Sequence, residues 1–155
     1  VTVKHFACNN QEDNRNYVSS NLSERALREI YLRAFEETVV EGKAKSIMTS
    51  YNRVNGVYSP NSYDLCTKVL RNEWGFEGVV MTDWFSTGGK KGDTAVCMAA
   101  GNDLIMPGGA TFKAEILLGL RSGKLTKADL RRCCANVLKQ IFDSPTQREY
   151  IDGNP

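Results

Sequence analysis

Apolar residues along the chain fall into two patterns, one typical of strands and one typical of helices. Short apolar runs occupy residues 1–6, 45–51, 78–83 and 103–106, and they are too short for helices, which predicts buried strands. After each run, apolar residues recur every three or four positions. This spacing predicts amphipathic helices at residues 22–41, 62–74, 94–100, 112–121 and 127–142.

Local signals at the ends of these segments support the assignment. Asn21 and Thr126 each precede a helical pattern and have an acid three residues later, Glu24 or Asp129, as in a capping box. The segment 8–21 is polar and predicts a loop, and the segment 52–60 predicts a loop with a turn at Asn55-Gly56. In the last helix we expect Leu130, Val137, Leu138 and Ile141 to line the core face.

The order of elements predicts an α/β fold built from parallel βα repeats. Strands joined by helices imply parallel pairing and right-handed crossovers. A complete TIM-type (β/α)8 barrel needs about 250 residues, so residues 1–143 have room for about half of one, with about four βα units. Residues 144–155 are polar and predict a tail or linker. The chain opens on a strand without an initiator Met, and we expect it to be a piece of a longer protein.

Composition and charge narrow the function classes. The chain is 41% hydrophobic and 25% charged, which is typical of a globular protein, and its net charge of +2 comes from scattered basic residues. These values give no support for a nucleic-acid or membrane partner, and no apolar run reaches the length of a bilayer span. The five cysteines fit no zinc or redox motif, which favours reduced thiols and a cytoplasmic location. One histidine cannot form a metal cluster, so we expect neither metal nor cofactor.

The candidate chemistry lies where the predicted strands end. The carboxyl ends of parallel strands share one rim, which is where ligands bind in such folds. An acid at the end of a buried strand is unusual, because an ionised carboxylate is costly to bury. Cations that donate to hydroxyls, flat aromatic faces and a carboxylate together suit a sugar ligand. The rim or the loop beside it carries Lys4, His5, Arg15, Tyr51, Asp83 and Trp84.

Each of these side chains also has an ordinary structural explanation. Asp83 could cap the next turn, the histidine and the aromatic residues could be core side chains, and the cations could pair within loops. Lys4 on a barrel strand could instead be the Schiff-base nucleophile of an aldolase. The glycine-rich loop at residues 88–92 lacks the spacing of a phosphate-binding loop.

Several motifs in order resemble glycoside hydrolase family 3, in its β-glucosidase branch. The similarity runs from residue 3 to about residue 142. The motifs are Lys4-His5-Phe6 with Asn9-Asn10-Gln11-Glu12 and Arg15, Ser50-Tyr51-Asn52 with Asn55-Gly56, Leu70-Arg71 with Glu73-Trp74-Gly75-Phe76 and Gly78, Val80-Met81-Thr82-Asp83-Trp84, and Ala100-Gly101-Asn102-Asp103-Leu104 with Met106-Pro107-Gly108. Thr82 stands where the family usually has Ser. The run Ala7-Cys8-Asn9-Asn10 differs from the N-acetylglucosaminidase branch.

The resemblance implies a retaining β-glucosidase that hydrolyses terminal β-D-glucosyl residues of a β-glucoside or oligosaccharide. Asp83 would be the nucleophile that forms a covalent glycosyl-enzyme. Lys4, His5 and Arg15 would hold the hydroxyls of the sugar. Tyr51 would lie beneath its ring near the nucleophile, and Trp84 would flank the same subsite.

The same resemblance implies that part of the enzyme lies outside this chain. A retaining enzyme needs a second acid, which in the family typically comes from a separate α/β domain, and the other half of the barrel is absent too. We therefore expect the chain alone to be inactive. Two alternatives for the isolated chain are a non-catalytic sugar-binding module and a half-barrel that forms homo-oligomers through its open sheet edges.

Overall fold

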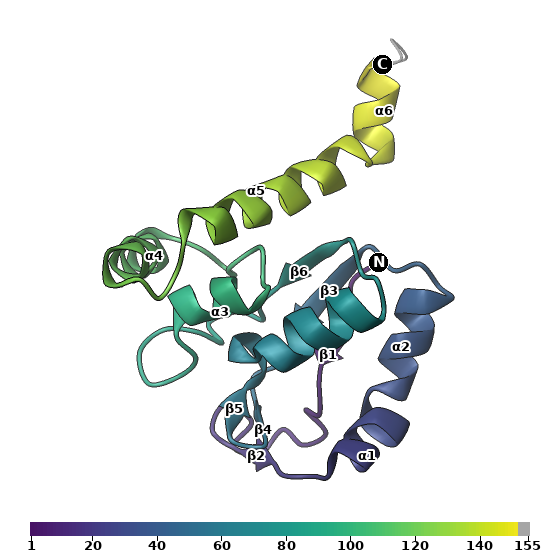
Figure 1. Cartoon of the computed structure of the whole chain (residues 1–155), viewed down its shortest axis with the longest axis vertical. Coiled ribbons are helices and arrows are strands. Elements are labelled where there is room, and N and C mark those ends of the chain that lie inside the picture. The colour runs from purple at the N-terminus through teal and green to yellow at the C-terminus, as the bar shows by residue number, and fades with distance from the viewer. Residues whose placement is uncertain (152–155) are drawn as a thin grey trace.

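A parallel three-stranded sheet forms the centre of the computed structural model, which describes residues 1–151 (Figure 1). The strands β1 (Val3–Phe6), β3 (Ser46–Thr49) and β6 (Val79–Met81) lie in the order β1-β3-β6, and both pairings are parallel. The predicted α/β class with parallel βα units is therefore confirmed. The described strands form an open sheet and do not close a barrel.

Helices follow each strand, as the periodicity predicts. The helices between β1 and β3 and the helices between β3 and β6 pack beside the sheet, and the remaining helices follow β6 and lead to the C-terminus (Figure 1). Their bounds are α1 (Glu24–Ala26), the π-helix η1 (Leu27–Tyr31), α2 (Arg33–Val40), the 3-10 helix η2 (Ser59–Asn61), the π-helix η3 (Asp64–Glu73), α3 (Thr94–Ala100), α4 (Ala110–Ser122), α5 (Lys127–Phe142) and α6 (Pro145–Ile151).

Two hydrophobic clusters hold these layers together. The first joins the sheet to the helices before and after β3 and includes the fully buried Phe6, Leu32 and Leu70. Phe6 also meets Phe35 edge-on, at 5.1 Å between ring centroids. The second cluster joins α3, α4 and α5 around Cys97 and other apolar residues. Val80 of β6 belongs to the first cluster and is fully buried, so that cluster packs the strand against the helices.

The fourth predicted strand, at residues 103–106, is present only as an isolated bridge between Met81 and Leu104. The backbone there does bond to the sheet edge, because Leu104 N donates to the Val80 carbonyl and Thr82 N donates to the Leu104 carbonyl. Leu104 is 39% exposed and has no strand on its other side among the described residues. Without a second neighbour, the segment does not develop a regular ladder.

A second small sheet was not predicted, because its strands are only two residues long. It consists of β2 (Ser19–Ser20), β4 (Arg53–Val54) and β5 (Val57–Tyr58), in the order β2-β4-β5. The predicted turn at Asn55-Gly56 is confirmed as the hairpin between β4 and β5. Both turn residues have positive φ, 49° and 86°, a conformation that Asn and Gly adopt readily.

The capping predictions have mixed outcomes. Ser23, not Asn21, caps the first helix, and its hydroxyl accepts a hydrogen bond from Ala26 N. The chain enters the helix two residues later than expected because Asn21 instead accepts from Ser19 Oγ. Thr126 caps α5 in a complete capping box with Asp129, as predicted.

The C-terminal segment contains the short helix α6 where a tail or linker was predicted. The polar sequence gave no periodic signal there. Residues 152–155 lie outside the described part of the chain, so the linker role stays a prediction. The cysteines are free, and four of the five are buried. The cytoplasmic location stays a prediction as well.

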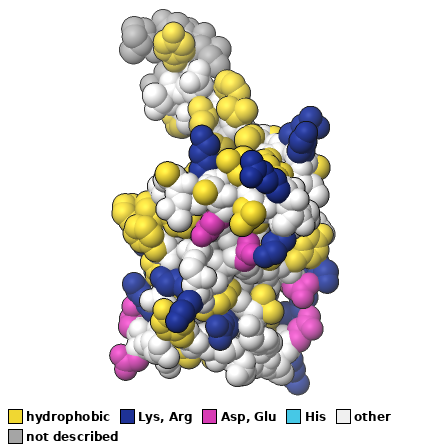
Figure 2. Space-filling model, turned by 90° about the vertical axis from the view of Figure 1, so that its left-hand side faces the viewer, with side chains coloured by type: hydrophobic (Ala, Val, Ile, Leu, Met, Phe, Trp, Pro, Cys, Tyr) yellow, Lys and Arg dark blue, Asp and Glu magenta, His cyan; other side chains and the backbone are white. Residues whose placement is uncertain are grey.

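Part of the surface is apolar. Figure 2 shows hydrophobic side chains in the upper part of one face with Lys and Arg side chains among them, and acidic side chains in the middle and lower parts. Leu138 and Ile141 of α5 were expected in the core but are 51% and 47% exposed, because the second half of α5 projects beyond the sheet (Figure 1). No helix among the described residues is both long enough and apolar enough to cross a bilayer.

Candidate active site

Asp83 lies directly after β6 and is 9% exposed. The backbone around it is fixed by the neighbouring segment. Thr82 Oγ1 accepts a hydrogen bond from Met106 N at 2.9 Å, and Phe85 N donates to the Met106 carbonyl at 3.1 Å. These bonds hold the residues before and after Asp83, so the carboxylate occupies a defined place at the carboxyl end of the sheet.

The Asp83 carboxylate has partners from three segments that are far apart in the sequence. Oδ1 accepts from the Tyr51 hydroxyl at 2.9 Å and from Trp84 N at 2.6 Å. Oδ2 lies 3.3 Å from His5 Nε2. Ser86 N and Oγ donate to the backbone carbonyl of Asp83, not to its side chain. Because Oδ1 also accepts from Trp84 N, the side chain bonds to the start of the following turn as well as to Tyr51 and His5.

Tyr51 links the acid to two cations. Burial and the hydrogen bond to Asp83 raise the pKa of Tyr51 to about 12, so the phenol remains a donor at neutral pH. The Arg15 guanidinium lies over its ring, 4.5 Å from the centroid, and also pairs with Glu12 at 2.7 Å. Lys91 Nζ lies 5.9 Å from the same centroid. Sequence reasoning missed Lys91, whose glycine-rich loop it considered only for phosphate.

The remaining two candidates differ in position. Trp84 is 53% exposed, so its indole is available to a ligand, while its carbonyl accepts from the Tyr51 hydroxyl at 2.8 Å. Lys4 is exposed, and its side chain forms no hydrogen bond or ion pair with any described residue. The structure thus brings five of the six candidates into one connected group and leaves Lys4 outside these contacts.

A buried polar network supports the end of β6 and was not recognised as structural from the sequence. Arg71 Nη2 lies 2.6 Å from Asp103 Oδ2, and the two side chains are 12% and 0% exposed. The same carboxylate oxygen accepts from Val80 N, and Oδ1 accepts from Asn136. Burial raises the pKa of Asp103, and the Arg71 charge opposes that shift. The network joins η3, β6 and α5, which places the strand that carries Asp83.

The arrangement is chemically suited to a polyhydroxylated ligand. One partly accessible carboxylate is oriented by a phenol, an imidazole and a backbone amide, next to a free indole face and two cations. Among residues 1–151, no group of three or more His, Cys, Asp or Glu residues is placed to hold a metal ion.

Comparison with known proteins identifies the family of this chain. The profile described as "Glycosyl hydrolase family 3 N terminal domain" matches residues 1–139. A β-glucosidase from Ruminococcus albus is 43% identical over 92% of this chain and 16% of its own length. An exo-α-(1→6)-L-arabinopyranosidase from Bifidobacterium breve is 45% identical over 91% of this chain and 18% of its own length.

Solved structures show the same similarity. β-Glucosidase 3B from Thermotoga neapolitana in complex with glucose superposes with a TM-score of 0.87 at 44% identity, over 99% of this chain and 22% of that one. A β-glucosidase from Kluyveromyces marxianus in complex with glucose gives a TM-score of 0.82 at 40% identity. The chain spans 16% to 22% of the length of these four proteins. Since the family profile covers nearly the whole chain, the chain belongs to glycosyl hydrolase family 3, within its N-terminal domain.

Proposed function

We propose that this chain is the part of a retaining β-glucosidase that carries the catalytic nucleophile, Asp83. The observation that supports it most is the environment of the carboxylate at the end of β6, where Tyr51 and His5 contact different oxygens. The relatives named as β-glucosidases support the substrate class.

The chemistry follows from that geometry. Asp83 attacks the anomeric carbon of a β-glucoside, and the bond to the leaving oxygen breaks as the covalent glycosyl-enzyme forms. A second carboxylic acid protonates the leaving oxygen and then takes a proton from the water that releases glucose. The hydroxyl of Tyr51 holds Oδ1, and Oδ2, which lies beside His5, is the oxygen that attacks.

The second acid would come from outside this chain. In retaining enzymes the two carboxyl groups are about 5–5.5 Å apart. Within residues 1–151, no carboxylate other than Asp83 bonds to His5, Tyr51 or Trp84, and Glu12 joins the group only through Arg15. We therefore propose that the remaining half of the barrel and a second domain complete the site, and that the isolated chain does not turn over substrate.

A covalent label tests the role of Asp83. The full-length protein would be incubated with a mechanism-based fluoroglucoside, and the labelled peptide would be identified by mass spectrometry. We expect the label on Asp83 and no label in an Asp83→Asn variant. Asp13→Asn is a matched control, since that acid is exposed in the loop after β1 and its carboxylate bonds to no described residue. A label on another carboxylate would refute the assignment.

The identity of the sugar is tested separately. Rates on the p-nitrophenyl glycosides of β-D-glucose and α-L-arabinopyranose would be compared, because one relative is named for the second sugar. We expect faster hydrolysis of the glucoside. A preference for the arabinopyranoside would leave the assignment of the nucleophile standing and would contradict the proposed substrate class.

For the isolated chain, a role as a sugar-binding or self-associating half-barrel remains our second proposal. β1 and the Leu104 segment are the two ends of the main sheet, and each has one neighbour among the described residues. Such edges favour pairing with another chain. Light scattering over a concentration range should show dimers or larger species, whereas a monomer at all concentrations would oppose self-association.

A further inference from the structure

The loop at residues 88–92 carries two neighbouring lysines that differ in their contacts. Lys90 is exposed, and its side chain forms no hydrogen bond or ion pair with any described residue. Lys91 is partly buried, and its Nζ donates to the Phe85 carbonyl at 2.7 Å. The same Nζ lies over the ring of Tyr51, 5.9 Å from the centroid. Of the two lysines, the second is therefore the one that reaches the candidate active site.

The backbone of the loop holds Lys91 in this position. Gly88 N donates to the Gly92 carbonyl at 2.7 Å, and Lys91 N donates to the Gly88 carbonyl at 3.2 Å, so the loop forms a tight turn. Gly92 lies close to Asn61, because a Cβ added at Gly92 would be 2.4 Å from Asn61 Oδ1. The loop therefore sits close to the body of the protein, and a larger residue at position 92 would displace it.

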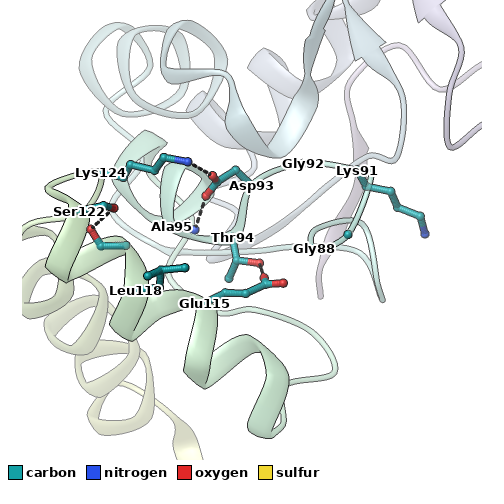
Figure 3. Close-up of a pocket in the computed structure, with 12 residues that line it drawn as sticks. Gly88, Lys91, Gly92, Asp93, Thr94, Ala95, Glu115, Leu118, Ser122 and Lys124 are labelled. Atoms are coloured by element: carbon teal, nitrogen blue, oxygen red, sulfur yellow. Dashed lines mark hydrogen bonds and ion pairs between the residues drawn. The ribbon is translucent and has the colours of Figure 1, made fainter.

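The side chain of Lys91 is directed away from the cavity beside this loop. That cavity has a volume of about 520 Å³ and lies between the loop, the start of α3 and one side of α4. Lys91 is one of its lining residues, but Figure 3 shows the side chain pointing away from Glu115 on the opposite wall. The contacts of the ammonium group are thus with the candidate active site.

Three consecutive carbonyl groups after β6 each accept a hydrogen bond from a side chain. The pairs, acceptor first, are Asp83 with Ser86, Trp84 with Tyr51, and Phe85 with Lys91. Phe85 has a φ of 56°, which a bulky residue rarely adopts, so this turn depends on bonds that hold it. The bond from Lys91 holds the peptide group next to the Trp84 carbonyl, and it thereby keeps that carbonyl at the Tyr51 hydroxyl.

The charge of Lys91 acts on the same phenol. Arg15 also lies over the Tyr51 ring, but its charge is balanced by Glu12 at 2.7 Å. Lys91 forms no ion pair with any acid among the described residues. A cation within about 6 Å of an aromatic face attracts the electrons of the ring. The Tyr51 hydroxyl is therefore a stronger donor to the Asp83 carboxylate, which it meets at 2.9 Å.

We propose that Lys91 is a positioning residue for Asp83 and that it acts through the Tyr51 hydroxyl. The inference rests on the proposed function, because it assigns Lys91 a role in the release of the sugar from Asp83. The ammonium group forms no hydrogen bond or ion pair with Asp83 itself. It fixes the turn that orients the phenol and strengthens the phenol as a donor, which favours the carboxylate as its negative charge returns.

The test compares single and double variants of the full-length protein. The substrate is 2,4-dinitrophenyl β-glucoside, whose good leaving group makes release of the sugar the slower step, so kcat measures that step. Lys91→Met should lower kcat roughly threefold, and Tyr51→Phe roughly tenfold. If Lys91 acts through the hydroxyl, the double variant should also lose about tenfold, whereas independent effects would multiply to about thirtyfold.

Two further variants serve as controls. Lys91→Arg keeps a cationic donor and should restore most of the rate. Lys90→Met removes a lysine from the same loop and should leave kcat unchanged. An unchanged kcat in Lys91→Met would overturn the proposal and leave the β-glucosidase assignment standing, as would an equal loss in Lys90→Met or a thirtyfold loss in the double variant. No hydrolysis by the unsubstituted protein would overturn the proposed activity and this role with it.

Discussion

The hydroxyl of Tyr51 offers the sharpest test of how this site works. Its oxygen lies 2.9 Å from Asp83 Oδ1 and 2.8 Å from the Trp84 carbonyl. Replacement by Phe removes the hydroxyl and keeps the ring that Arg15 covers. In the covalent intermediate that we propose, the Asp83 side chain is a neutral ester, and it regains negative charge as the sugar leaves. The missing donor therefore raises the barrier to release of the sugar, not the barrier to its attachment.

The magnitude follows from the hydrogen bond. A hydrogen bond to a charged group contributes about 1.5–3 kcal/mol, and each ~1.4 kcal/mol corresponds to a tenfold rate change. The phenol has a single proton, which serves both the carboxylate and the Trp84 carbonyl. We therefore expect the lower end of the range, a roughly tenfold slower hydrolysis of the glycosyl-enzyme by Tyr51→Phe.

Stopped-flow kinetics with p-nitrophenyl β-glucoside would measure both steps in the full-length protein. We expect Tyr51→Phe to release p-nitrophenol in a burst close to the concentration of active sites, followed by a slow steady state. Tyr17→Phe is the control, because Tyr17 is 51% exposed and its hydroxyl forms no hydrogen bond with any described residue. An unchanged steady-state rate without a burst would refute the reasoning, as would a slower first step.

Three further predictions concern stability and reactivity. Ultraviolet titration should show Tyr51 ionising near pH 12. Because folding raises the pKa of Tyr51, the stabilisation from its protonated hydroxyl is complete below about pH 10 and is lost as the pH rises through 12. In urea unfolding, the Tyr51→Phe variant should therefore lose less stability between these pH values than the unsubstituted chain. Arg71→Met leaves the carboxylate of Asp103 buried without its cation, which should cost about 3–5 kcal/mol in urea unfolding; Arg71→Lys, which keeps the charge, should cost less, and an equal loss would contradict the ion-pair explanation. The deficit of Arg71→Met should shrink in acid, where Asp103 is protonated. A thiol reagent should modify Cys134 first under native conditions, because the other four thiols are buried; fast reaction of a second cysteine, detected by mass spectrometry, would contradict the described core.

The sequence predicted those elements whose signals are local. Short apolar runs marked β1, β3 and β6, and apolar residues at helical spacing marked the helices between them. It missed β2, β4 and β5, since pairs of residues carry no periodicity, and it overestimated the strand at residues 103–106. It also placed Leu138 and Ile141 in the core, because a periodic pattern identifies an apolar face without showing whether anything covers it.

For the candidate site, the order of strands and helices alone indicated which strand ends would share a rim. Asp83, His5 and Tyr51 could be grouped because parallel strands place their carboxyl ends together. Tertiary structure decided the rest, because hydrogen bonds and ion pairs depend on distances between residues far apart in the chain. It showed which Asp83 oxygen each partner contacts, left Lys4 outside these contacts, and brought Lys91 to Tyr51. The cavity of about 520 Å³ between α4 and the loop at residues 88–92 also depends on packing, and no local pattern in the sequence contains it.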